Sequence, residues 1–332
     1  MLQKITSIVA AGVALAGLAA CSRKVEEPPA SVAATVGAPA ARPLAAHTPN
    51  ATVVTPASAA PPHRAPAKAP DRLRFAVIGD YGAAGEDERK VADLVKAYHP
   101  EIVITTGDNN YPRGGADTID RNIGQYYSEY IGSYNGAYGS GASENRFFPA
   151  LGNHDWYTDD AKPYLDYFTL PGNERYYSFV AGPVEFFALD SDPREPDGVS
   201  ATSRQAAWLK AAASASKATW QIVYFHHPAY SSGPHGSATA LQWPYREWGV
   251  DLVLAGHDHT YERNEVDGLT YLVVGLSGNH EYGFNQTAEG SKFRYNQRHG
   301  AELADATLDE LRLAFVVDDG TRIDEVVLTH GK

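Results

Sequence analysis

The chain has 332 residues, of which 28 are Lys or Arg and 40 are Asp or Glu, so its net charge is −12 at pH 7. General binding of nucleic acid depends on an excess of basic residues, and this balance therefore argues against that class of protein. Hydrophobic residues make up 43% of the chain, which is ample for a large buried core.

Residues 1–21 have the pattern of an export signal. Lys4 precedes an apolar stretch over residues 5–20, which is short and rich in Ala and Gly compared with a membrane span of about 20 strongly apolar residues. The stretch closes on Leu-Ala-Ala-Cys, similar to a bacterial lipoprotein signal in which Cys21 is acylated after cleavage. An ordinary cleaved signal with an incidental Cys is the alternative. We expect an exported protein that is lipid-anchored through Cys21 in the bacterial envelope (periplasm or outer membrane).

Residues 22–70 consist mostly of Ala, Pro, Val, Ser and Thr and show no periodicity. This composition buries too little apolar surface to offset the entropy of ordering, which predicts a disordered tether. The folded domain is then expected over 71–332. Because Cys21 is the only cysteine, this domain contains no disulfide.

The sequence after residue 70 predicts helices and strands in alternation. Apolar runs at 75–80 and 102–108 flank a helical period over 86–98 and form a βαβ unit. Further helices are predicted over 117–131 and 203–214, the second with Ser203 as its N-cap, and the other strands at 147–154, 176–180, 184–189, 221–226 and 251–259. Late runs at 269–276, 311–317 and 323–328 predict strands of a second sheet. The expected fold class is α/β, a two-sheet β-sandwich with βαβ units flanked by helices.

Five of these apolar runs end in side chains that bind metal ions. The candidates are Asp80, Asp108, Asn153, His226, His257 and His259. In layered α/β folds the carboxyl ends of strands converge on one crevice, and these oxygen and nitrogen donors suit two hard or borderline cations. The sequence therefore predicts a binuclear metal site, in which Asp108 most sensibly bridges the two ions.

This set, in this order, resembles the calcineurin-like metallophosphoesterase superfamily, whose signature is Asp, Gly-Asp, Gly-Asn-His-Asp/Glu, His and Gly-His-x-His. Most members begin with Asp-x-His, whereas here Gly82 takes the place of that His, and Tyr111 follows three residues after Asp108. This pair of changes is similar to the purple acid phosphatases, in which a tyrosinate completes a ferric site. His235, nine residues after His226, fits the same family. The small, tartrate-resistant type is the nearer match, because no large β-domain precedes the first motif.

The resemblance implies that Asp80, Asp108, Tyr111 and His259 hold Fe(III), and that Asp108, Asn153, His226 and His257 hold a divalent metal (Fe, Zn or Mn). It implies an acid phosphatase-like hydrolase that cleaves phosphate monoesters by attack of a metal-activated hydroxide on phosphorus. An acidic optimum is expected, since Fe(III) is the stronger Lewis acid.

His154 and His235 are candidates for protonating the leaving group and holding the phosphoryl charge, because neither is needed as a ligand. Asp155 is a candidate for orienting His154. His227 is expected to be a packed or rim residue, and His280 at best to lie behind the ligands or at the substrate rim. The Tyr-rich stretch 126–138 forms either a lid or a packed helix and loop.

Two other functions remain open: a phosphodiesterase or nucleotide hydrolase on the same scaffold, and a non-catalytic surface lipoprotein. The expected partners are a phosphate-ester small molecule and, through the lipid anchor on Cys21, a membrane. Neither a nucleic acid nor an obligate protein partner is expected.

Overall fold

The computed structural model describes residues 71–330. The chain divides into two units, 1–62 and 63–332, and all described residues belong to the second unit. The expected signal segment, the acylation site Cys21 and the tether over 22–70 lie outside the described residues. None of the helices within 71–330 combines the length and apolar character needed to span a bilayer.

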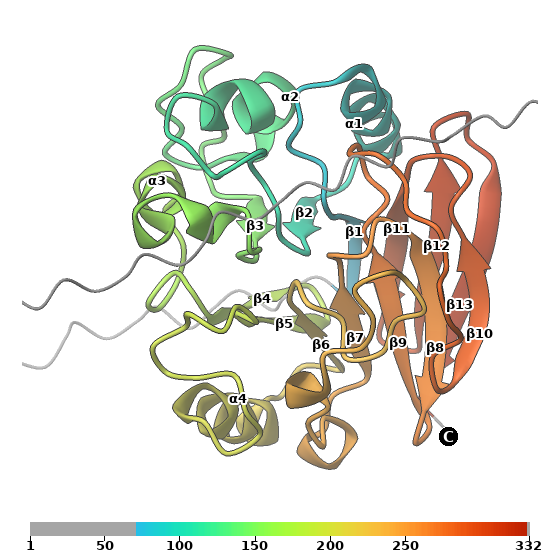
Figure 1. Ribbon diagram of the computed structural model, residues 1–332. Helices are drawn as coiled ribbons and strands as arrows, with labels where there is room; N and C mark the ends of the chain where they lie inside the picture. Colours follow the sequence, from blue (N-terminus) through green and yellow to red (C-terminus); the bar gives the residue numbers. More distant parts are fainter. Residues whose placement is uncertain (1–70, 331–332) are drawn as a thin grey trace, which may run out of the picture. The chain divides into compact units, whose positions relative to one another are not determined.

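The strands of residues 71–330 form two mixed sheets (Figure 1). The first, in the order β13-β12-β11-β1-β2-β3, contains β1 (Arg72–Ile78), β2 (Ile102–Thr105), β3 (Phe147–Pro149), β11 (Gly300–Thr307), β12 (Glu310–Val317) and β13 (Arg322–Thr329). The second, in the order β10-β8-β9-β7-β6-β5-β4, contains β4 (Tyr177–Ala181), β5 (Val184–Ala188), β6 (Trp220–Tyr224), β7 (Leu252–Ala255), β8 (Tyr261–Val266), β9 (Leu269–Val274) and β10 (Ser291–Tyr295).

Of the two buried apolar clusters in the described residues, the larger lies between the sheets, and the smaller includes Leu209 of α4 (Arg204–Ala215) and Val223 of β6. Phe75 of β1 and Phe186 of β5 meet edge to face with ring centroids 5.2 Å apart, and both are fully buried. Helices α1 (Glu86–Tyr98), α2 (Gln125–Tyr127) and α3 (Lys162–Tyr167) lie on the side of β1 to β3, and α4 lies on the side of β4 to β6 (Figure 1). Ser203 caps α4 by accepting a hydrogen bond from the backbone N–H of Ala206. The predicted α/β sandwich with flanking helices is confirmed.

The helix predicted over 117–131 is not one regular helix. It consists of a π-helical turn η1 (Asp120–Gly124), α2 and a 3-10 turn η2 (Ser128–Tyr130). Gly124 weakens the α-helical pattern, and the wider turn accommodates Ile123 and Tyr127, which are both fully buried. This part of the Tyr-rich stretch is therefore packed into the core and is not a lid. The remaining short turns are η3 (Asp155–Tyr157), η4 (Asp159–Ala161), η5 (Thr239–Leu241) and η6 (Arg246–Trp248).

The expected membership of the second sheet is wrong. β9 joins the second sheet beside β7, but β12 and β13 extend the first sheet, because β11 pairs antiparallel with β1. The sequence pattern missed β11, which contains only small and acidic residues around a single Leu303. A strand of this composition shows no apolar run, and only its pairing with β1 makes it part of the core.

Candidate metal centre

Three of the candidate ligands have an unusual backbone conformation. Asp80 (φ 55°), Asp108 (φ 51°) and His257 (φ 70°) adopt the left-handed region, each just beyond a strand of the parallel part of a sheet. Residues other than glycine rarely occupy this region, and such strain concentrates at functional sites. The local backbone therefore supports a functional role for these strand ends.

A first cluster of ligand atoms surrounds the Tyr111 hydroxyl. This hydroxyl lies 3.0 Å from Asp108 Oδ2, 3.2 Å from Asp80 Oδ1 and 3.1 Å from His259 Nε2. His259 Nε2 lies 3.5 Å from Asp80 Oδ1. All four side chains are buried, and they come from the ends of β1, β2 and β7. The structure thus brings together the four side chains assigned to the ferric site.

A second cluster surrounds His226 Nε2. This nitrogen lies 3.0 Å from Asn153 Oδ1, 3.1 Å from His257 Nδ1 and 3.4 Å from Asp108 Oδ1. Asn153 donates its amide N–H to the Tyr157 hydroxyl at 2.9 Å, which turns its oxygen towards His226. These are the four side chains assigned to the divalent site.

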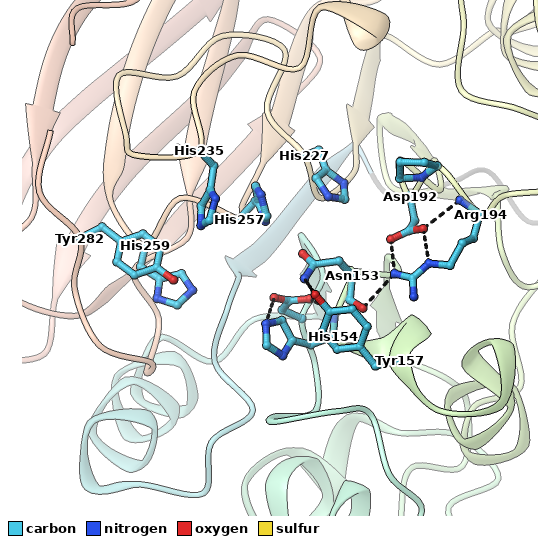
Figure 2. Close-up of a pocket in the computed structure, with 12 residues that line it drawn as sticks. Asn153, His154, Tyr157, Asp192, Arg194, His227, His235, His257, His259 and Tyr282 are labelled. Atoms are coloured by element: carbon cyan, nitrogen blue, oxygen red, sulfur yellow. Dashed lines mark hydrogen bonds and ion pairs between the residues drawn. The ribbon is translucent and has the colours of Figure 1, made fainter. Parts of the chain in front are cut away.

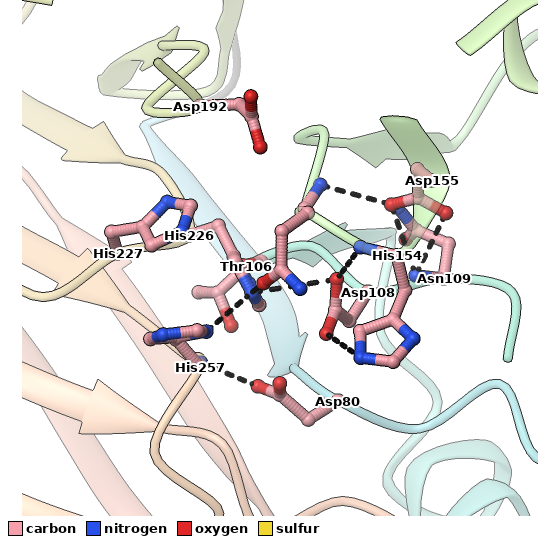
Figure 3. Close-up of polar contacts among 12 residues, drawn as sticks. Asp80, Thr106, Asp108, Asn109, His154, Asp155, Asp192, His226, His227 and His257 are labelled. Atoms are coloured by element: carbon pink, nitrogen blue, oxygen red, sulfur yellow. Dashed lines mark hydrogen bonds and ion pairs between the residues drawn. The ribbon is translucent and has the colours of Figure 1, made fainter. Parts of the chain in front are cut away.

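Asp108 belongs to both clusters. Its Oδ2 faces Tyr111 and its Oδ1 faces His226. Figure 3 shows its carboxylate between the two strand ends that carry Asp80 and His257 and the loop that carries His154. A carboxylate with its oxygens divided in this way has the geometry of a bridge between two cations.

Backbone carbonyls orient two of the candidate ligands. His226 donates its Nδ1–H to the carbonyl of Thr106 at 2.9 Å, and His259 donates its Nδ1–H to the carbonyl of His280 at 2.6 Å. Both bonds leave Nε2 with a free lone pair for a cation. His280 therefore contacts the candidate ligand His259 through its backbone carbonyl, while its imidazole is exposed.

The electrostatics of the site favour added positive charge. Burial opposes ionisation of Asp108, but His226 and then His154 outweigh it and lower the pKa of the carboxyl. Burial also opposes protonation of His226, but Asp108 and Asp80 outweigh it and raise the pKa of the imidazole to about 10. A proton or a metal ion is thus stabilised between these side chains.

Tyr111 depends on such a charge to ionise. Burial first, and then the carboxylates of Asp108 and Asp80, raise the pKa of the phenol well above its usual value. Two carboxylates, a phenol, an amide and three imidazoles form a donor set that suits two borderline or hard cations, so the residues fit a binuclear centre.

Glycines permit this close packing. A Cβ at Gly256 would lie 2.5 Å from Asp80 Oδ2 and 2.7 Å from Thr106 Oγ1. A Cβ at Gly152 would overlap the backbone N and Oδ1 of Asp108. The glycines of the Gly-Asn-His and Gly-His-x-His motifs are therefore required by the space around the carboxylates.

A cavity of about 470 Å³ opens onto the clusters (Figure 2). It is lined by Asp108, Asn153, His154, Tyr157, Asp192, Pro193, Arg194, His227, His235, His257, His259 and Tyr282. Both proposed acid–base residues face it. His154 donates Nδ1–H to the Pro112 carbonyl at 2.6 Å, and the His235 ring lies 4.2 Å from the ring of His257.

Asp155 does not orient His154. Its carboxylate accepts hydrogen bonds from the backbone N–H groups of Asn109 and Gly152 and from the Asn109 side chain, as Figure 3 shows. It therefore ties together the two loops that carry Asp108 and Asn153. The side chain of His154 is oriented by the Pro112 carbonyl instead.

His227 lies at the rim of the cavity, as expected. Its ring nitrogen comes within 4.8 Å of those of His226 and His257, but its Nδ1 is engaged with Ser191 Oγ at 2.9 Å. Sequence reasoning missed Asp192, Arg194 and Tyr282. No local motif marks the first two, whereas Tyr282 follows the second Gly-Asn-His sequence at 278–280, which could have pointed to this loop.

The sequence profile of the calcineurin-like phosphoesterase family matches residues 73–261, and the chain belongs to this family. Its relatives include purple acid phosphatase 17 of Arabidopsis thaliana, 31% identical over 63% of this chain and 70% of that protein. Tartrate-resistant acid phosphatase type 5 of Sus scrofa is 23% identical over 61% of this chain and 69% of that protein.

The fold agrees with these relatives. The structure of purple acid phosphatase PPD1 from yellow lupin (Lupinus luteus) superposes with a TM-score of 0.60 at 20% identity, covering 78% of this chain and 55% of that one. The expected membership of the purple acid phosphatases within the superfamily is confirmed, and with it the class of acid phosphatase-like metallophosphoesterase.

Proposed function

We propose that this protein hydrolyses phosphate monoesters at a binuclear centre of Fe(III) and a divalent metal, Fe, Zn or Mn, with an acidic optimum. The observation that carries the proposal is the position of the Asp108 carboxylate between the two clusters. Its Oδ2 lies 3.0 Å from the Tyr111 hydroxyl, and its Oδ1 lies 3.4 Å from His226 Nε2. The relatives named purple acid phosphatase 17 and tartrate-resistant acid phosphatase type 5 support hydrolysis of phosphate esters.

When bound, the two cations supply Lewis acidity to the phosphoryl oxygens and lower the pKa of coordinated water. Asp80, Tyr111 and His259 would hold the ferric ion, Asn153, His226 and His257 the divalent ion, and Asp108 both. Fe(III) is supported by the position of the Tyr111 hydroxyl, 3.0 Å from Asp108 Oδ2 and 3.1 Å from His259 Nε2, because a phenolate oxygen in this donor set would suit a hard trivalent ion.

His154 and His235 act on the substrate. The Pro112 carbonyl fixes the tautomer of His154, whose Nε2 is 3.9 Å from Asp108 Oδ2 and faces the cavity. His235 faces the cavity beside His257, on the opposite side from His154 (Figure 2). One imidazole on each side suits protonation of the leaving oxygen and stabilisation of charge on the phosphoryl group.

We also propose that the protein is exported and anchored in the bacterial envelope through Cys21. The support is the signal pattern of residues 1–21 and the composition of residues 22–70. Labelling of cells with a radioactive fatty acid tests it: the wild-type chain is expected to take up label and Cys21→Ser is expected not to. Label that persists in Cys21→Ser contradicts the anchor.

The test of function is release of inorganic phosphate by the metal-loaded chain from a monoester and a diester with the same leaving group, between pH 4 and 8. We expect the monoester to be cleaved faster, with a maximum on the acidic side, and Asp108→Asn to abolish both activities. Faster cleavage of the diester favours the phosphodiesterase. No cleavage of either by protein with two bound metals favours the non-catalytic lipoprotein.

A further inference from the structure

Arg194 is the one Lys or Arg among the described residues that line the cavity. It lies in the loop after β5, next to Asp192, on the same side of the cavity as Asn153 and Tyr157 (Figure 2). His235 and Tyr282 form the opposite side. A cation at this position faces the part of a bound substrate that extends from the two ligand clusters into the cavity.

The guanidinium of Arg194 is held rigidly. Its Nε donates to Asp192 Oδ1 and its Nη2 to Asp192 Oδ2, both at 2.7 Å, which is the bidentate geometry of an Arg–carboxylate pair. Its Nη2 also donates to the backbone carbonyl of Asn153 at 3.2 Å, and the group lies 5.2 Å from the centre of the Tyr157 ring. Asp192 is itself almost completely buried, with 2% of its side chain exposed.

These contacts leave the Nη1 end of the guanidinium without a hydrogen-bond partner among the described residues. Of its five N–H groups, the one on Nε and the two on Nη2 have partners, whereas those on Nη1 donate to no described residue. The Arg194 side chain is 39% exposed. Asp192 thus orients the guanidinium while its two remaining donors stay available for a ligand.

The position of Arg194 relative to the cluster around His226 indicates which part of a substrate it can contact. Arg194 Nη2 lies 3.2 Å from the backbone oxygen of Asn153, and the side-chain oxygen of the same Asn153 lies 3.0 Å from His226 Nε2. Asn153 therefore separates the guanidinium from the proposed divalent site, since its backbone oxygen contacts Arg194 and its side-chain oxygen contacts His226. An anionic group a few bonds beyond the reacting phosphate comes within reach of the two remaining N–H groups on Nη1.

We propose that Arg194 is a specificity-determining residue that binds a second anionic group on the substrate, so that the preferred monoesters carry a carboxylate or a further phosphate on the leaving group. The inference rests on the proposed phosphatase function. Arginine is suited to this role because its planar fork pairs with the oxygens of such groups, whereas a lysine would act as a single point charge.

Two substrates that differ by one carboxylate test the proposal. O-phosphoserine and O-phosphoethanolamine have closely similar leaving groups, but only the first carries the additional anion. The measured quantity is kcat/KM for O-phosphoserine divided by kcat/KM for O-phosphoethanolamine, both determined with the metal-loaded full chain. Arg194→Gln is expected to lower this ratio about tenfold, the usual worth of a hydrogen bond to a charged group. The control is Arg204→Gln, an exposed arginine of α4 paired with Asp197, which is expected to leave the ratio unchanged.

Because Arg194→Gln leaves the buried Asp192 carboxylate without its cationic partner, the double variant Asp192→Asn/Arg194→Gln is measured beside it, and the same fall in the ratio is expected. A ratio that stays at the wild-type value in both variants overturns the role of Arg194. Calorimetric binding of methylenediphosphonate, an analogue of pyrophosphate that cannot be hydrolysed, relative to inorganic phosphate provides a readout without turnover. If neither ester is cleaved, the proposed function fails, but the binding experiment still decides the role of Arg194. A preference for methylenediphosphonate over phosphate that Arg194→Gln abolishes supports the role, and a preference that Arg194→Gln leaves intact overturns it.

Discussion

Asp108 and His226 follow strands of different sheets, yet Asp108 Oδ1 lies 3.4 Å from His226 Nε2. The other oxygen of Asp108 faces Tyr111, which belongs to the loop after β2 in the first sheet. The candidate centre thus lies at the junction of the two sheets and exists only when they are packed together. Metal binding and sheet packing are therefore expected to be thermodynamically linked.

Asp108→Asn is expected to lose both metals, because an amide removes the negative charge and one of the oxygens shared by the two clusters. The metal-to-protein ratio, measured by elemental analysis after gel filtration, checks this. The control Asp93→Asn changes an exposed carboxylate on α1 that pairs with Arg89, and it is expected to retain wild-type metal content. Full occupancy of either metal in Asp108→Asn would show that Asp108 is not a bridge.

Tyr111→Phe is expected to abolish the visible absorption of a tyrosinate–Fe(III) pair while retaining part of the hydrolytic activity. The phenyl ring keeps the packing against His154, whose ring centroid is 4.5 Å away. Tyr282→Phe is the matched control and is expected to keep the absorption, since Tyr282 stacks on His259 at 4.0 Å without belonging to either cluster. A purple Tyr111→Phe protein would remove Tyr111 from the coordination sphere.

His235→Ala is expected to lower kcat by about a hundredfold, the usual contribution of a positioned acid–base group, at unchanged metal content. The reason is that His235 faces the cavity and stacks on His257 but lies in neither cluster. His330→Ala, which removes an imidazole stacked on Trp220 outside the cavity, serves as the control. Loss of metal from His235→Ala would instead assign His235 to the ligands.

Gly256→Ala is expected to displace the Asp80 carboxylate, because the new methyl group would lie 2.5 Å from Asp80 Oδ2. Overpacking of this kind costs about 1–3 kcal/mol of folding free energy, and the displaced carboxylate should weaken metal binding as well. Chemical denaturation and metal analysis measure the two effects. Gly283→Ala, where a Cβ meets nothing within 4 Å, should change neither. Equal stability and metal content in both variants would refute the close approach.

Glu302→Gln is expected to make the stability less dependent on pH. Glu302 is fully buried on β11, and neither carboxyl oxygen has a hydrogen-bond partner among the described residues. Burial, and then Asp324, raise the pKa of Glu302 well above its usual 4.5. The folded state therefore retains a proton that the unfolded state loses, and stability is complete below pH 4.5 and falls by up to about 1.4 kcal/mol per pH unit above it.

The melting temperature between pH 4 and 8 measures this effect. The wild-type protein is expected to lose stability relative to Glu302→Gln as the pH rises, and the two should converge at the acidic end. Glu129→Gln, an exposed residue, should follow the wild type. Parallel curves for wild type and Glu302→Gln would mean that Glu302 has an ordinary pKa in the folded protein.

Local patterns in the sequence were sufficient for α1, for the Ser203 cap and for finding the candidate ligands at the strand ends that the structure brings together. A helical period, a capping residue and a Gly-Asp or Gly-His pair are each readable within a few residues, because they depend on the backbone of one segment. The resemblance to purple acid phosphatases followed from the same short motifs, including the replacement of the usual His by Gly82 and the presence of Tyr111.

Only the tertiary structure decided which strands share a sheet and which loops meet at the cavity. β11 enters the core through its pairing with β1, more than 200 positions away in the chain, and its composition does not show this. Arg194 and Asp192 belong to no motif, and Asp155 binds Asn109 rather than His154. The physical reason is that side-chain period reports the local backbone alone, whereas strand pairing and the contacts of loops follow from burial and hydrogen bonding between distant segments.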